Sequence, residues 1–248
     1  MKIDLNCDLG ESFGRYSLGM DEQVLAVITS ANIACGFHAG DPEVMQKTVA
    51  LAQKNQVAIG AHPGFPDLVG FGRRKMQLTP AAVQADIIYQ LGALQAFCGG
   101  TPLHHVKPHG ALYNMAADDL TLATAICNGI ASVDPSACLI GLANSNLIKA
   151  ARQVGLPYAQ EVFADRQYLP NGRLVPRNQP NAMIADEDIA VQRVLRMVKD
   201  HVVTAVDGSE VSIIPDTICV HGDGPKALAF VKRIHAALIE NQIAVTAF

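Results

Sequence analysis

The most constraining feature of this sequence is the regular alternation of strand-like and helix-like segments along nearly the whole chain. Short apolar, β-branched runs predict strands at residues 2–7, 31–36, 57–61, 104–107, 138–143, 159–163 and 217–221. Longer amphipathic stretches predict helices at about 21–29, 42–54, 80–98, 117–131, 145–154, 186–201 and 224–240. Because each helix carries the chain back to the start of the next strand, repeated units of this kind build a parallel sheet.

The number of these units favours a closed sheet over an open one. Seven units and a final apolar run at 243–248 predict one α/β domain over residues 1–248, a seven- or eight-stranded (β/α) barrel, regular or distorted. An open doubly wound sheet is the alternative, but it usually carries a glycine-rich nucleotide loop, and neither GxGxxG nor GxxxxGK(S/T) occurs. Only 204–214 departs from the pattern, since the VDGS turn at 206–209 predicts a hairpin insertion.

Composition and charge exclude several classes of protein. Nineteen Lys and Arg against 23 Asp and Glu give a net charge of −4 without a basic run, which argues against nucleic acid as a partner. No apolar segment approaches membrane-spanning length and the first residues lack a signal-peptide pattern, so we expect a soluble, cytoplasmic protein with no membrane partner. Six scattered cysteines without a CxxC pair predict reduced thiols rather than disulfides or a zinc cluster.

Four histidines occupy the same kind of position, at the end of a predicted strand with glycine one or two residues later: His38, His62, His109 and His221. The carboxyl ends of parallel strands lie on one face of a sheet, so these side chains can converge there. A single strand-end histidine often only anchors a loop through a backbone carbonyl, but four of them predict a functional site. His221 also precedes a helix start, where backbone N–H groups bind anions, and is a candidate substrate contact.

The first strand adds carboxylates to this site. Strand alternation places the polar residues of DLNCD (4–8) on one face, which indicates a barrel interior that opens into a polar site. Asp8, at the carboxyl end, is a candidate general base or metal ligand. His38 and His62 are catalytic candidates beside it, either to shuttle protons or to bind a divalent metal together with Asp8. Asn6 is a candidate substrate contact on the same face.

The densest cluster of polar residues is HHVKPHGALYN at 104–114. Lys107 ends an apolar strand, where a desolvated ammonium could polarise a carbonyl or neutralise a developing oxyanion. His109 is a catalytic candidate in the same cluster. His104 and His105 cannot both face the barrel interior, so one of them is expected to be structural.

Charged side chains in the predicted loops are candidates for binding an anionic substrate. Arg73 and Arg74 follow the third strand, and Asp165 and Arg166 follow the sixth. Arginine pairs bidentately with carboxylate or phosphate, although a loop arginine is by default a solvated surface residue. Glu11, in the loop after the first strand, is equally consistent with ordinary surface.

Six blocks of sequence, taken together, resemble the LamB/YcsF family. They are DLNCDLGESFG (4–14), NIACGFHAGD (32–41), GAHPGFPDLVGFGRR (60–74), KPHGALYN (107–114), EVFADRQY (161–168) and VHGD (220–223). The blocks run in order through nearly the whole chain, with no departure at a motif position.

The resemblance implies a barrel of the glycoside hydrolase/deacetylase-like kind that serves an ATP-dependent 5-oxoprolinase, which hydrolyses 5-oxo-L-proline to L-glutamate. It also implies partner subunits B and C and the use of ATP, with Mg²⁺, by the complex. Because a lactam is a stabilised amide whose ring readily re-forms, we hypothesise that the partners phosphorylate the amide oxygen and that this chain adds water. Two other hypotheses stay open: a stand-alone metal-dependent deacetylase or amidohydrolase, and a non-catalytic subunit that delivers substrate.

Overall fold

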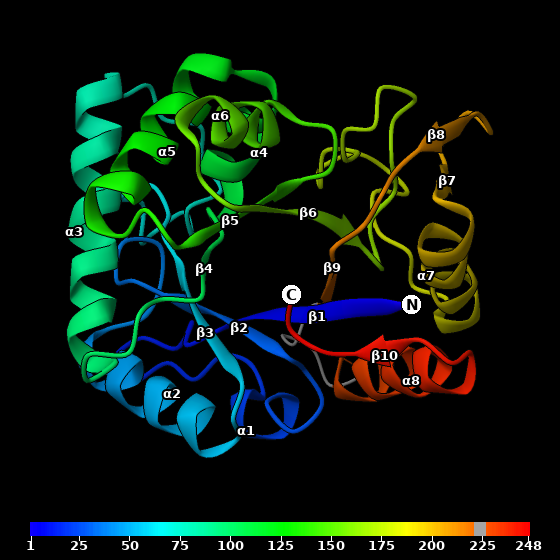
Figure 1. Ribbon diagram of the computed structural model, residues 1–248, viewed down its shortest axis with the longest axis horizontal. Coiled ribbons are helices and arrows are strands. Elements are labelled where there is room, and N and C mark those ends of the chain that lie inside the picture. The colour runs from blue at the N-terminus through cyan, green and yellow to red at the C-terminus, as the bar shows by residue number, and fades with distance from the viewer. Residues whose placement is uncertain (221–226) are drawn as a thin grey trace.

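Seven parallel strands close into a barrel in the computed structural model, which describes residues 1–220 and 227–248 (Figure 1). The strands are β1 (Lys2–Leu9), β2 (Ser30–Ala34), β3 (Ala58–His62), β4 (His105–Val106), β5 (Cys138–Leu142), β6 (Tyr158–Phe163) and β9 (Thr217–Val220). They pair in this order, and β9 pairs back with β1. The predicted barrel is therefore confirmed in its seven-stranded form, and the open-sheet alternative is wrong.

Three further strands lie outside the barrel wall. β7 (Val202–Thr204) and β8 (Glu210–Ser212) form an antiparallel hairpin around the turn at 206–209. The final apolar run contributes β10 (Ala244–Val245), which pairs in parallel with the start of β1. The run therefore extends the sheet beside β1 and does not form an eighth barrel strand.

Helices surround the strands and connect them (Figure 1). They are α1 (Asp21–Val24), α2 (Pro42–Lys54), α3 (Pro80–Phe97), α4 (Gly110–Asp118), α5 (Leu120–Val133), α6 (Asn146–Val154), α7 (Glu187–Asp200) and α8 (Ala227–Glu240). Among the described residues, no helix combines the length and the apolar character that crossing a lipid bilayer requires.

Two predicted helices differ from the observed ones. The helix expected at 117–131 is two helices, because Asp119 is extended and its carboxylate caps α5 by accepting from the N–H groups of Thr121 and Leu122. The sequence analysis assigned no helix to the residues directly before 117, but they form most of α4, which begins directly after His109. The helix expected at 21–29 is only the four residues of α1. The expected start at 224 lies outside the described residues.

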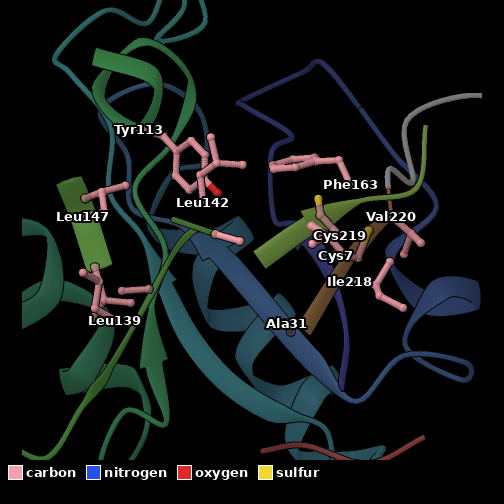
Figure 2. Close-up of a cluster of buried hydrophobic side chains, with 14 of the residues drawn as sticks. Cys7, Ala31, Tyr113, Leu139, Leu142, Leu147, Phe163, Ile218, Cys219 and Val220 are labelled. Atoms are coloured by element: carbon pink, nitrogen blue, oxygen red, sulfur yellow. The ribbon is translucent and has the colours of Figure 1, made fainter. Parts of the chain in front are cut away.

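The main hydrophobic core lies between the barrel and the helices. On β1 the odd-numbered residues Leu5, Cys7 and Leu9 are at most 1% exposed and belong to this layer. Figure 2 shows part of it, including Ala31 and Ile218. All six cysteines are buried free thiols. Packing of one face of each strand against helices leaves the other face to fill the barrel centre.

The barrel centre holds a small apolar cluster and a larger polar group. Side chains of β5 and β6, such as Ile140 and Ala159, belong to the apolar cluster. Most of the polar side chains, which are amides, histidines and carboxylates, come from β1 to β4. Gly60 makes room for the polar group, because a Cβ there would lie 2.1 Å from the ring of His105. The polar group leads to the functional site.

Candidate active site

The inward-facing residues of β1 begin a series of hydrogen bonds that leads towards the carboxyl ends of the strands. Asp4 accepts hydrogen bonds from the hydroxyls of Thr29, Ser30 and Thr217. Burial raises the pKa of Asp4, and these hydroxyls offset the rise only in part. Asn6, the next inward residue, donates to Thr217 Oγ1 at 2.7 Å. Both side chains are buried inside the barrel, so the predicted substrate contact Asn6 lies beneath the site rather than in its wall.

Asn32 on β2 connects these residues to Asp8. Its Nδ2 donates to Asn6 Oδ1 and to Asp8 Oδ1, both at 2.8 Å. Its Oδ1 lies 2.8 Å from His105 Nε2, and because an amide oxygen only accepts, His105 must donate there. Neither His105 nor His104 is among the residues that line the adjoining cavity. Both therefore act as structural side chains, where the sequence analysis expected one.

Lys107, directly after β4, is buried in the middle of the site. Its Nζ lies 2.8 Å from Glu161 Oε1, 3.0 Å from Asp8 Oδ1, 3.1 Å from Asn6 Oδ1 and 3.1 Å from Cys219 Sγ. Burial alone would lower the pKa of Lys107, but the carboxylates of Asp8 and Glu161 outweigh it, and the pKa is raised well above its ordinary value. Lys107 is therefore a permanent cation whose three hydrogens already have acceptors.

Glu161 on β6 is a site residue that the sequence analysis did not select. It is fully buried, and its Oε2 accepts a hydrogen bond of 2.6 Å from the hydroxyl of Tyr113 on α4. Burial is the main cause that raises the pKa of Tyr113 well above its ordinary value, and the neighbouring Glu161 raises it further, so this hydroxyl remains a donor. The available signal was a carboxylate inside a strand, followed directly by the apolar residues Val162 and Phe163.

Backbone carbonyls fix one ring N–H on each of two histidines. His62 Nδ1 lies 2.7 Å from the carbonyl oxygen of Lys107, and His109 Nε2 lies 2.9 Å from that of Phe71. A carbonyl oxygen only accepts, so both of these nitrogens carry hydrogen, and the other ring nitrogens are the ones that face the site. Those two nitrogens, His62 Nε2 and His109 Nδ1, face each other at 2.9 Å. Asp8 Oδ2 lies 3.3 Å from His62 Nε2.

His38 completes a group of three histidines. Its ring stacks on that of His109 with 3.6 Å between centroids and 3° between planes, and its Nε2 lies 3.2 Å from Glu11 Oε1. Burial, then His109 and His62, lower the pKa of His38 well below its ordinary value. Burial, then His62, lower the pKa of His109 to about 3. Both rings are therefore neutral near pH 7, as metal ligation requires.

This group suits a divalent cation. Glu11, His38, His62 and His109 each offer one ligand atom, and these atoms all lie within 4.8 Å of one another. His62 Nε2 and His109 Nδ1, the ring nitrogens opposite those bound to backbone carbonyls, could both ligate one cation, and a carbonyl on the second ring nitrogen is the usual support of a metal-binding histidine. Three nitrogens and a carboxylate oxygen suit zinc or another first-row transition metal. The structure adds Glu11 and His109 to the two predicted histidines, and it places Asp8 against Lys107 and beside His62.

A cavity of about 840 Å³ adjoins this group at the carboxyl ends of the strands. Of the predicted site residues, it is lined by Asp8, His62, Arg73, Lys107, His109 and Arg166. Glu11, which was consistent with ordinary surface, also lines it. The structure thus brings together side chains from the ends of β1, β3, β4 and β6, which is where parallel barrels carry their active sites.

The remaining predicted residues lie elsewhere. His38 is behind His109 and fully buried, and Asp165 is buried beside Arg166 without lining the cavity. The Arg74 side chain is 66% exposed and is bound to the carboxylate of Asp67. It does not line the cavity, because its loop turns it outwards. His221 lies outside the described residues.

Fold and site together define a closed (β/α) barrel of the deacetylase-like kind with a histidine–carboxylate group at its carboxyl end. Peptidoglycan deacetylase PdaC from Bacillus subtilis is similar in fold alone, with a TM-score of 0.51 and 11% identity over 99% of this chain and 87% of that one. The chain belongs to the LamB/YcsF family, whose model matches residues 3–248.

Two relatives resemble the chain over nearly its full length. A 5-oxoprolinase subunit from Limosilactobacillus fermentum is 58% identical over 246 residues, which cover 99% of both chains. The lactam utilization protein from Thermus thermophilus has a TM-score of 0.94 and 46% identity, with both chains fully covered.

Proposed function

We propose that this chain is the hydrolytic subunit of an ATP-dependent 5-oxoprolinase and opens 5-oxo-L-proline to L-glutamate. The relatives named for this activity and for lactam use support the substrate. The observation that best supports the proposed reaction is the contact of Asp8 with Lys107 at 3.0 Å. Both residues line the cavity, and so do His62 and His109. The pair of Asp8 and Lys107 combines a base with a fixed positive charge beside a reacting carbonyl.

Asp8 is the proposed general base. Lys107 and Asn32 both donate to its Oδ1, which stabilises the anion and leaves Oδ2 towards His62 and the cavity. In the proposed step, water adds to the ring carbon of the lactam whose amide oxygen the partners have phosphorylated, and Asp8 takes a proton of that water. Both protons of the water pass to the ring nitrogen, one of them through Asp8, so that the carbon–nitrogen bond breaks to give an acyl phosphate and a free amino group. A second water then hydrolyses the acyl phosphate to the side-chain carboxylate of glutamate and free phosphate.

Lys107 supplies positive charge to the developing oxyanion, and Arg73 is the proposed partner of the substrate carboxylate. Lys107 needs no proton transfer for this role, because its ammonium is permanent. Arg73 lines the cavity next to the histidines, where its guanidinium lies 4.9 Å from the ring centroid of Phe71. A cation bound by Glu11, His38, His62 and His109 would polarise the carbonyl or lower the pKa of water.

In this proposal, the partner subunits B and C use ATP to activate the lactam. The sequence carries no phosphate-binding loop of the two common types, which fits ATP cleavage, with Mg²⁺, on the partners. Phosphorylation of the amide oxygen by the partners would make the ring carbon reactive, and hydrolysis of the resulting acyl phosphate would make ring opening irreversible.

The decisive experiment assays this chain, its partners and the mixture on 5-oxo-L-proline, with and without ATP, while glutamate and phosphate are measured separately. We expect glutamate only from the mixture with ATP, and at least a 100-fold loss of glutamate release with Asp8→Asn. Full glutamate production by the partners alone, or an unchanged rate with Asp8→Asn, would contradict the proposal.

The same samples test the two other hypotheses. A stand-alone metal-dependent deacetylase or amidohydrolase would act without partners on an acetylated or amide substrate and lose activity on chelation. A substrate-delivering subunit would lose affinity for 5-oxo-L-proline with Lys107→Met, while its bound substrate would turn over at the original rate.

A further inference from the structure

Arg166 is a buried cation that the proposed chemistry does not use. It follows β6, is only 4% exposed, and lines the cavity. Its Nη2 donates to the carbonyl oxygen of Val175 at 2.6 Å. Its Nε is buried and has no hydrogen-bond acceptor among residues 1–220 and 227–248. A buried guanidinium N–H without an acceptor is costly, and at the wall of a cavity a ligand oxygen is the natural acceptor.

A second arginine reinforces the charge at this wall. Arg177, on the same long loop, is exposed and also lines the cavity. Burial first, and then Arg177, lower the pKa of Arg166 to about 10, and Asp165 offsets this in part. Arg166 therefore stays protonated near pH 7, and the two guanidinium groups repel each other. An oxyanion bound between them would remove that repulsion and satisfy the open donor.

The two arginines lie on a different loop from Arg73. Arg73 is on the loop after β3 and close enough to His38 and His109 to contribute to their lowered pKa values. Arg166 and Arg177 are on the loop after β6. A volume of about 840 Å³ is in the range that takes a drug-sized ligand, which is much larger than a five-membered lactam acid. The cavity is thus built for a ligand with a second anionic group.

We propose that Arg166 and Arg177 form a subsite for a phosphoryl group, separate from the histidine–carboxylate group. Two guanidinium groups match the double charge and the several oxygens of a phosphoryl group better than a single carboxylate, which Arg73 already serves. The assignment to substrate rests on the proposed function: the ligand is a small lactam derivative that carries both a carboxylate and a phosphoryl group.

Phosphate binding to the full-length chain tests the subsite directly. Calorimetric titration uses inorganic phosphate, methyl phosphate and acetate as probes against the original chain, Arg166→Gln and Arg177→Gln. We expect Arg166→Gln to weaken phosphate and methyl phosphate at least 10-fold and Arg177→Gln to weaken both several-fold, while acetate binding at this subsite is weaker than phosphate binding. Arg152→Gln is the matched control, since Arg152 is exposed on α6 and donates to the hydroxyl of Tyr158.

The outcomes separate the subsite from the proposed function. No phosphate binding by the original chain, or equal binding by the original chain, Arg166→Gln and Arg177→Gln, would overturn the subsite. AMP is titrated as a fourth probe, and its binding at least 10-fold tighter than methyl phosphate would overturn the assignment to a small phosphorylated lactam and indicate a nucleotide. Arg177 is exposed, so its variant keeps the test valid if Arg166→Gln fails to fold. None of these titrations depends on glutamate formation, so a failure of the proposed function is recognised separately.

Discussion

At the scale of single residues, the site is organised around one ammonium and two carboxylates. Lys107 lies between Asp8 and Glu161, and of these two carboxylates only Asp8 lines the cavity. A lone buried ammonium would give up its proton. Glu161 therefore helps Asp8 to keep Lys107 charged.

Glu161→Gln tests this coupling. The variant leaves the buried ammonium with one carboxylate instead of two, and we expect unfolding free energy to fall by about 3 kcal/mol and kcat/KM to fall at least 10-fold. Tyr113→Phe is the control, because it removes only the hydrogen bond to Glu161 and should cost about 1 kcal/mol. Urea unfolding and steady-state rates are the measurements. Equal losses in the two variants would show that the charge of Glu161 is unimportant.

The lowered histidine pKa values predict a specific acid sensitivity of the metal-free chain. His109 has its pKa lowered from 6.5 to about 3, so between these values the unfolded chain binds more protons than the folded one. Its contribution to stability is complete above pH 6.5 and is lost as the pH falls towards 3, by up to about 1.4 kcal/mol per pH unit. His109→Gln should reduce the slope of unfolding free energy between pH 6 and 4 by about that amount.

Urea unfolding at several pH values measures this slope, and His201→Asn provides the control. His201 is exposed at the end of α7, so the control should keep the original slope. Parallel pH profiles for the original chain and His109→Gln would contradict the assignment of His109 as a buried neutral ring.

At the scale of elements, the loop between β3 and α3 fixes the histidines from outside the barrel. Phe71 has a positive φ of 52° and offers its carbonyl to His109, while Gly72 offers its carbonyl to the N–H of Ala111 at the start of α4. Asp67 holds the loop in this shape by accepting from the N–H of Gly70 and from the Arg74 side chain. The outward arginine is thus part of the support of the site.

Gly72→Ala should disturb the histidines through simple contact. A Cβ at this position would lie 2.7 Å from His109 Cδ2 and 2.7 Å from His38 Cβ. We expect Zn²⁺ affinity to fall at least 10-fold in calorimetric titration. Gly208→Ala is the matched control, since Gly208 also has positive φ but open space around it, so it carries backbone strain without the contact. Equal Zn²⁺ affinity in both variants would contradict the cation site.

The same elements show what the sequence could predict. Strand ends were visible as apolar runs followed by histidine and glycine, so the convergence of His62, His109 and Lys107 could be expected from the parallel topology. The sequence could not show which of Arg73 and Arg74 lines the cavity, because this depends on the turn that Asp67 stabilises. Glu161 was missed because its partners, Lys107 after β4 and Tyr113 on α4, are about 50 residues away in the sequence.

At the scale of the whole molecule, the barrel closes through polar contacts between its first and last strands. Thr217 on β9 donates to Asp4 and accepts from Asn6, both on β1. These contacts pair the buried polar groups of the two strands with each other. This set of contacts, the β1–β9 seam, therefore favours the one register of the two strands in which the buried polar groups have hydrogen-bond partners.

Thr217→Val should weaken this seam. The substitution keeps the shape but leaves Asn6 without its acceptor and Asp4 without one donor, so we expect a loss of about 2–4 kcal/mol in unfolding free energy. Thr246→Val, at an exposed position, should change stability by less than about 0.5 kcal/mol. Urea unfolding measures both, and similar values would show that the seam contributes little.

Lys107 contributes to the site twice, through its ammonium and through the carbonyl that holds His62. Every amino acid supplies a carbonyl at this position, and Pro108 restricts the preceding residue to extended backbone whatever its side chain. A substitution at position 107 would therefore remove the ammonium charge, while the backbone carbonyl would still hold the His62 imidazole in place. A lineage that abandoned lactam chemistry could keep its histidine cluster intact, and a histidine motif alone would not distinguish such a descendant from an active member.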